Sequence, residues 1–220
     1  MEINELLTSN KSDEEKISYL KSSKNVTLPP IELLMQEYDP MKHRVHNQID
    51  RPDKVRANQK VDKVSRIHLA LQQLVVRRMT EFMFAIPVKR VYHGQDKSDL
   101  HKEFAQAIEA VYMRNRIDSR NLERARQLFA GCETATLWST RESKNKDYGF
   151  ESTKKLACKT YSPMDGYRLY PYFDESDDLV AMSIEYSTQK SDTTRDYLFE
   201  TYTADRHLRW KSSQSDSTDE

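Results

Sequence analysis

The stretch Ala130-Gly-Cys-Glu-Thr-Ala-Thr-Leu-Trp-Ser-Thr140 marks the point at which the pattern of the chain changes. Before it, apolar residues recur every three or four positions, which is the period of an amphipathic helix. From Thr134 onward the segments are rich in β-branched and aromatic residues with a period of two, as in strands. The sequence therefore predicts an α+β fold, in which helices come first and an antiparallel meander follows and packs against them.

Upstream of this point the spacing predicts one long amphipathic helix among several shorter ones. The long helix carries an apolar stripe from Val64 to Ile86, and Pro87 ends it. The other expected elements are short helical pieces or a loose arm over 1–25, helices over 31–38 and 99–115, a strand over 88–92 with a turn at 93–96, and a helix that begins at Asp118 or Ser119 and ends before a C′ glycine, Gly131.

Downstream of it the period of two predicts the strands of the meander. They are expected over 134–140, 154–161, 167–173, 180–186, 197–202 and 208–210, with turns at 162–166 and 174–178. The expected organisation is a polar N-terminal arm over 1–30, one α+β domain over 31–211 and a disordered polar tail over 212–220.

The composition excludes several classes of protein. Four glycines in 220 residues supply neither a dinucleotide-binding nor a P-loop motif, and two cysteines supply no disulfide framework. The longest apolar run, Phe82 to Ile86, is far shorter than the ~20 residues of a membrane span. The N-terminus has no basic and apolar signal pattern. We expect no cofactor, no membrane partner and no secretory signal.

A net charge of zero conceals an uneven distribution. Residues 42–90 hold 12 Lys/Arg against 4 Asp/Glu, a balance of +8, whereas residues 142–220 hold 11 against 16, a balance of −5. Such asymmetry indicates either an anionic partner or contacts between subunits.

The basic segment supplies the candidate interface residues, which are Arg51, Lys54, Arg56, Lys60, Lys63, Arg66, Arg77 and Arg78. Two interpretations are open. Either these cations contact the phosphates of a nucleic acid non-specifically, or they belong to a solvated helix face or form ion pairs with the acidic sheet of a neighbouring subunit.

Other chemical motifs are weak. His43 and His46 lack the glutamate of a zinc-helix motif, and the acidic set at 174–178 lacks the glycine and distal glutamate of a calcium loop, so we expect no metal. A nuclease would combine Pro52-Asp53 with Glu142-Ser-Lys144, but these lie about 90 residues apart. Cys132 and Cys158 are expected to be buried and free.

Seven tyrosines of the expected meander could stack single-stranded bases, but core or cross-strand pairing is the favoured interpretation. They are Tyr161, Tyr167, Tyr170, Tyr172, Tyr186, Tyr197 and Tyr202. No catalytic residue is predicted.

Four segments in order resemble the N-terminal part of the portal proteins of long-tailed bacteriophages. They are Leu33–Tyr38 followed by His43-Arg-Val, Asn58–Ile86 followed by Pro87-Val88, Asn121–Trp138, and a last one that joins Tyr161-Ser-Pro163, Tyr170–Asp174 and Leu179–Tyr186. The resemblance covers about residues 31–210.

The resemblance implies a structural virion protein, the wing of a portal subunit. Such subunits form a ring, in the full-length family a dodecamer, at the capsid vertex through which double-stranded DNA is packaged and ejected. Implied partners are other copies of the chain, terminase, a head–tail adaptor and double-stranded DNA, with assembly in the host cytoplasm. Members are about twice this length, so the chain would be a fragment, a truncated product or a divergent relative. The alternative is a non-specific nucleic-acid-binding domain that uses residues 42–90.

Overall fold

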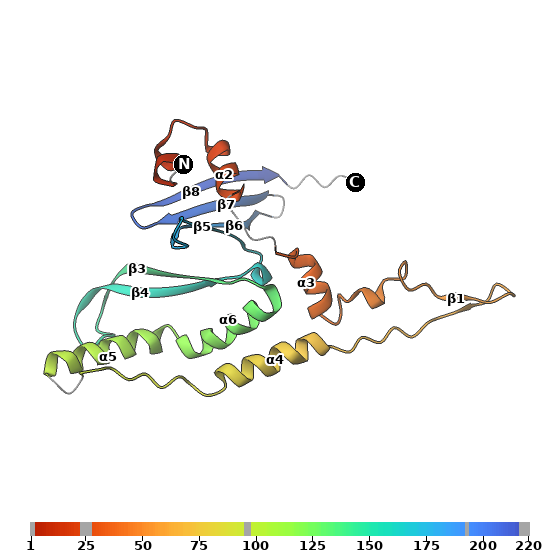
Figure 1. Cartoon of the computed structure of the whole chain (residues 1–220), viewed down its shortest axis with the longest axis horizontal. Coiled ribbons are helices and arrows are strands. Elements are labelled where there is room, and N and C mark those ends of the chain that lie inside the picture. The colour runs from red at the N-terminus through yellow and green to blue at the C-terminus, as the bar shows by residue number, and fades with distance from the viewer. Residues whose placement is uncertain (1–2, 23–27, 95–97, 192–193, 216–220) are drawn as a thin grey trace. The chain divides into compact units, whose positions relative to one another are not determined.

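The computed structural model describes residues 3–22, 28–94, 98–191 and 194–215 and confirms an α+β architecture with antiparallel sheets (Figure 1). The chain forms two compact units. Unit 1 combines residues 1–29 with 162–220, and unit 2 is residues 30–161. The first 29 residues, which lie in the segment predicted as a polar arm, belong to the same unit as the C-terminal part of the chain.

Unit 1 is a four-stranded meander with two helices. The strands pair in the order β5-β6-β7-β8, and the elements are α1 (Ile3–Thr8), α2 (Asp13–Ser22), β5 (Arg168–Phe173), β6 (Leu179–Ser191), β7 (Thr194–Thr203) and β8 (His207–Ser215). The tail was expected to be disordered, but residues 212–215 pair with β7, because their backbone groups complete the ladder. The rest of that predicted tail, 216–220, lies outside the described residues.

The core of unit 1 explains why the first helices are ordered. Leu6 and Leu20 are 0% and 1% exposed, and they pack with Ala181 and Phe199 of the sheet. Lys21 forms a hydrogen-bonded ion pair with Glu185 of β6. The apolar residues of α1 and α2 therefore bury one face of the sheet, as layer packing requires.

Unit 2 packs three helices on α6 and also contains two hairpins. Its elements are α3 (Ile31–Tyr38), β1 (Lys54–Val55), β2 (Val61–Asp62), α4 (Leu71–Phe84), α5 (Asp99–Arg114), α6 (Ile117–Gly131), β3 (Ala135–Asn145) and β4 (Ser152–Tyr161). α3, α4 and α5 all contact α6, and β3 pairs with β4 as a separate two-stranded sheet. The single meander expected from the sequence is therefore two sheets, one in each unit.

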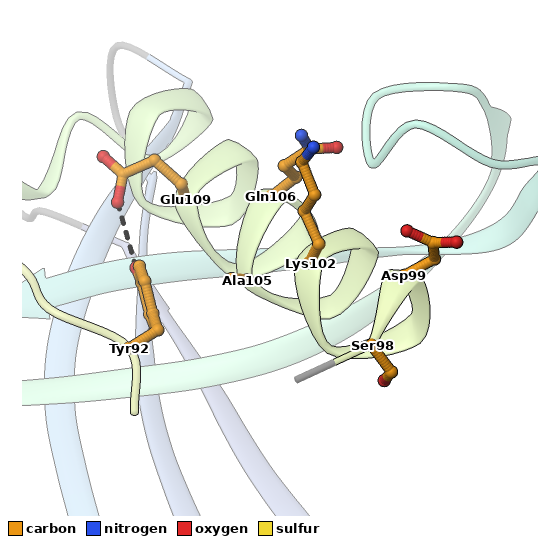
Figure 2. Close-up of a pocket in the computed structure, with 7 residues that line it drawn as sticks. All are labelled: Tyr92, Ser98, Asp99, Lys102, Ala105, Gln106 and Glu109. Carbon is orange, nitrogen blue, oxygen red and sulfur yellow. Dashed lines mark hydrogen bonds between the residues drawn. The ribbon is translucent and has the colours of Figure 1, made fainter. Parts of the chain in front are cut away.

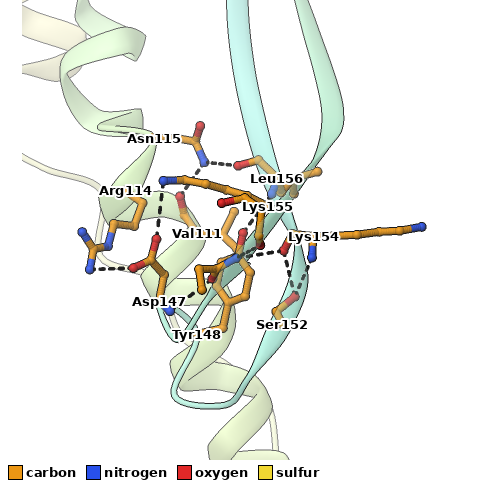
Figure 3. Close-up of polar contacts among 11 residues, drawn as sticks. Val111, Arg114, Asn115, Asp147, Tyr148, Ser152, Lys154, Lys155 and Leu156 are labelled. Carbon is orange, nitrogen blue, oxygen red and sulfur yellow. Dashed lines mark hydrogen bonds and ion pairs between the residues drawn. The ribbon is translucent and has the colours of Figure 1, made fainter.

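A polar joint fixes α5 to the β3–β4 hairpin (Figure 3). The Asn115 side chain donates to the carbonyl of Leu156 at 3.1 Å and accepts from the amide of Cys158 at 2.9 Å. Arg114 forms an ion pair with Asp147 of the hairpin at 3.0 Å. One amide side chain thus satisfies two backbone groups of β4, which locks the strand against the end of the helix.

Several local predictions are wrong, each for a physical reason. The long helix begins at Leu71 and not at Val64, because the preceding residues close a hairpin. Residues 88–92 are extended but pair with no described strand. α6 begins at Ile117, after Arg116 in the left-handed region at φ 51°, and its left-handed cap is Cys132, at φ 63°, which follows Gly131. The helices over 31–38 and 99–115 are confirmed to within one residue.

Candidate subunit and nucleic-acid interface

Residues 51–66, which we call the arm, carry six of the eight predicted interface cations. The arm is a hairpin of two two-residue strands, in which Lys54 pairs with Asp62 and Val55 with Val61. Figure 1 shows it extending outward from α3 and α4. Both valines are largely exposed, at 69% and 54%. An isolated hairpin is marginally stable in water, so the arm requires other interactions to hold its shape.

A clasp centred on Asp53 closes the base of the arm. One oxygen of the Asp53 carboxylate accepts from the backbone N–H of Val64 at 3.0 Å and from the guanidinium of Arg66 at 2.7 Å. The same guanidinium donates to the carbonyl of Arg51 at 2.7 Å. The Val64 amide and the Arg66 side chain together lower the pKa of Asp53 below its usual range. This carboxylate therefore has a structural role, which does not favour the nuclease pattern that the sequence suggested only weakly.

Internal ion pairs engage half of the predicted cations. Arg56 pairs with Asp62 across the hairpin, and Arg66 belongs to the clasp. Arg77 and Arg78 share the carboxylate of Glu81 on α4, at 2.9 Å and 3.3 Å, and these contacts lower the pKa of Glu81. The remaining four are exposed and form no ion pair with any residue that the structure describes; they are Arg51, Lys54, Lys60 and Lys63.

The apolar stripe predicted for the long helix is present on α4, but much of it is exposed to solvent, and the sequence did not indicate this exposure. Only Val76 and Thr80 of this helix are buried. Leu71, Val75 and Phe82, spaced at four and seven residues, are 62%, 55% and 93% exposed. The periodicity identifies the stripe, but it does not tell a face that packs within the chain from one that packs on another molecule.

The C-terminal half of α4 also borders an apolar hollow of about 520 Å³, lined by Arg78, Met79, Glu81, Phe82 and Met83. The hollow lies beside the exposed stripe. Large exposed apolar surfaces of this kind mark sites of interaction with other molecules.

A histidine stack links α3 to the segment that leads into α4. The rings of His43 and His68 lie 3.9 Å apart and nearly parallel. His43 accepts from the amide of Val45 at 3.1 Å, and its other nitrogen lies 3.4 Å from Glu37. Burial and the nearby charges of His43 and His46 lower the pKa of His68. The stack is a packing contact, and it gives His43 a structural role.

A polar pocket of about 570 Å³ lies along α5 (Figure 2), lined by Tyr92, Ser98, Asp99, Lys102, Ala105, Gln106 and Glu109. Figure 2 shows the Tyr92 hydroxyl directed at Glu109, to which it donates at 3.0 Å. Burial and this hydrogen bond raise the pKa of Tyr92. Ser98 is the N-cap of α5 and accepts from the amide of His101. The contacts in this pocket are those of the capped helix α5 packed on the segment that contains Tyr92.

A comparison with protein families tests the resemblance found in the sequence. The family of phage portal proteins of the SPP1 Gp6-like type matches residues 17–220. The chain belongs to the phage portal protein family. A search of the curated proteins finds no match.

Membership makes this portal chain a structural subunit and a component of the virion. Portal proteins act in DNA packaging as oligomeric rings, and the family is structural rather than enzymatic. No finding supports the nucleic-acid-binding alternative. Across 3–22, 28–94, 98–191 and 194–215, no cluster of three or more His, Cys, Asp or Glu is arranged to hold a metal ion. None of the described helices is both long and apolar enough to cross a bilayer.

The acidic set and the two cysteines, which the sequence analysis considered as chemical sites, have structural roles in the portal chain. The acidic set at 174–178 is the β5–β6 turn, in which Asp174 accepts from the amides of Ser176 and Asp178. Cys158 is buried as expected, but Cys132 is exposed, because it follows α6 as its cap.

Three tyrosines of unit 1 donate hydrogen bonds to carboxylates of the sheet. Tyr186 and Tyr202 both donate to Glu200, and Tyr170 donates to Glu185 at 2.7 Å. Burial and its contact with Glu185 raise the pKa of Tyr170. The hydrogen bonds from Lys21 and Tyr170 outweigh burial, so the pKa of Glu185 is lowered. The hydroxyl groups of these three tyrosines are therefore used in hydrogen bonds within unit 1.

Proposed function

We propose that copies of this chain form a closed ring at the capsid vertex through which double-stranded DNA enters and leaves. The family match over residues 17–220 carries this proposal. The proposal includes a ring of twelve subunits, assembly in the host cytoplasm, and docking of terminase and a head–tail adaptor, and the same family membership supports these parts of it.

The exposed apolar surface of unit 2 supports association. Leu71, Val75 and Phe82 of α4 leave an apolar stripe in solvent that a soluble monomer rarely tolerates. Interfaces of obligate assemblies are more apolar than the rest of a protein surface, so this stripe fits a surface covered in the assembled ring.

Electron microscopy of the purified chain tests the proposal. We expect closed rings of uniform subunit number. Phe82→Ser should keep the fold, because Phe82 is 93% exposed, and should reduce the fraction of rings. The control Leu100→Ser changes another exposed apolar residue, 74% exposed, outside α4 and should leave the rings intact. Monomers that bind double-stranded DNA with steep salt dependence would contradict the proposal and favour the nucleic-acid alternative.

A further inference from the structure

The two units carry opposite and equal net charge. Unit 1 holds 10 Lys/Arg against 18 Asp/Glu, a balance of −8, and unit 2 holds 25 against 17, a balance of +8. The boundary between them is set by packing and not by charge. A chain divided in this way has a positive and a negative surface available for a second copy.

The arm concentrates the charge of unit 2. Residues 51–66 hold six cations and two carboxylates, and both carboxylates are used in the internal pairs Arg56–Asp62 and Arg66–Asp53. Arg51, Lys54, Lys60 and Lys63 are left exposed without an ion pair to any described residue. The arm therefore presents four positive charges on a hairpin that needs a further surface for stability.

The β5–β6 turn concentrates the charge of unit 1. Asp174, Glu175, Asp177 and Asp178 lie within five residues, all exposed, and form no ion pair with any residue in the described ranges. Asp174 and the left-handed Asp177 shape the turn, whereas the side chains of Glu175 and Asp178 are not used in it. The turn thus presents four negative charges against the four of the arm.

We propose that the arm of one copy docks on the β5–β6 turn of a second copy. The proposal rests on the ring proposed above and names the surfaces that join its subunits. Because the two surfaces differ, the contact is head-to-tail, and repeated contacts close into a ring when the rotation between copies fits. The stripe on α4 is a separate surface, and its cations Arg77 and Arg78 are already shared with Glu81.

Charge reversal on each side tests the contact. The arm variant is Lys54→Glu with Lys60→Glu, and the turn variant is Glu175→Lys with Asp178→Lys. All four side chains are exposed, so both variants should fold, which circular dichroism checks. The matched control, Lys42→Glu with Lys89→Glu, makes the same charge change at exposed positions of unit 2 outside the arm.

Sedimentation velocity in about 50 mM salt measures the association. We expect each variant alone to associate about tenfold more weakly than the wild type, since two surface charge contacts are lost and reversed. The control should match the wild type. An equimolar mixture of the arm and turn variants should associate again, because acidic arms then meet basic turns.

The outcomes separate the two proposals. Wild-type rings that neither variant weakens would overturn the docking and leave the ring standing. A mixture that does not recover, or a control that is equally weak, would overturn the docking on this turn. An arm variant that forms normal rings but loses affinity for double-stranded DNA would make the arm a DNA surface. A wild-type chain that stays monomeric at every concentration would overturn both proposals.

Discussion

Asp53 shows at the scale of one residue how the arm is held. Its carboxylate joins Val64 and Arg66, which lie eleven and thirteen residues further along the chain. A contact over this distance leaves no trace in hydrophobic periodicity, so the sequence could not show that residues 64–70 leave the helical pattern. The sequence showed an aspartate at position 53, but it did not show that its carboxylate binds Val64 and Arg66.

Asp53→Asn should loosen the arm without unfolding unit 2, because it removes the charge from the clasp. The Val64 amide, which donates to Asp53, should exchange with solvent deuterium faster in the variant. Asp62→Asn is the control, since its exposed pair with Arg56 contributes little. Equal exchange rates at Val64 in the wild type and Asp53→Asn would refute the clasp.

The same carboxylate gives the arm a pH dependence of defined sign. The folded-state pKa of Asp53 is lowered, so its contribution is complete above the ordinary value of 3.8. It is lost as the pH falls through the lowered value. Protection of the Val64 amide should therefore persist at neutral pH and disappear only in acid.

The stack of His68 on His43 also depends on pH, because the folded state disfavours the charged form of His68, whereas it favours the charged form of Asp53. Its pKa is lowered from 6.5, so the folded state resists protonation. Stability of the stack with His43 is complete above this ordinary value and declines as the pH falls below it. Nuclear magnetic resonance titration should place His68 below its usual range, and Glu37→Gln should lower it further, because Glu37 raises the pKa. A titration at or above the usual value would contradict the buried stack.

At the scale of elements, local signals predicted some boundaries and missed others. The helices α3 and α5 start at Ile31, after Pro30, and at Asp99, after the capping Ser98, and both starts were visible in the sequence. The strands β3 to β8 were also located by their period of two, although β3, β6 and β8 extend beyond the predicted bounds and the short strands β1 and β2 were not predicted. The sequence could not show which strands pair with each other. It did not show that β3 and β4 form a sheet apart from β5–β8, or that residues 88–92 pair with no described strand.

α1 and α2 illustrate this limit. The first residues are polar on average, and only their few apolar positions indicate a contact. Leu6 and Leu20 become the most buried of these positions. Their partners, Ala181 and Phe199, lie about 180 residues away in the sequence, so the contact follows from the fold and not from local pattern.

Leu20→Ala should destabilise unit 1 by about 2–5 kcal/mol, the usual cost of a cavity at a buried leucine. Trp210 packs against this core and Trp138 lies in unit 2, so Trp138→Phe makes fluorescence report on unit 1 alone. Urea unfolding in that background measures the change. Leu179→Ala, at a leucine 58% exposed, should cost much less. If Leu20→Ala and Leu179→Ala lowered the free energy of unfolding equally, α2 would not be part of the core.

At the scale of the whole molecule, the two units that packing defines carry opposite net charge. The sequence showed a basic and an acidic half, but the units show that the N-terminal residues belong to the acidic one. The role of the eight candidate cations stays a prediction; four of them form internal ion pairs, and the four without a pair to a described residue lie on the arm. A neutral total thus results from two units that can attract each other between copies.

A disulfide cross-link between copies tests the head-to-tail contact most directly. One variant carries Lys60→Cys on the arm and the other Glu175→Cys on the turn, both with Cys132→Ser because Cys132 is exposed. Mixed in low salt under mild oxidation, they should form a linked heterodimer, and high salt should abolish it. A linked heterodimer that forms equally well when Lys42→Cys replaces Lys60→Cys, or copies that associate without any link, would contradict the account.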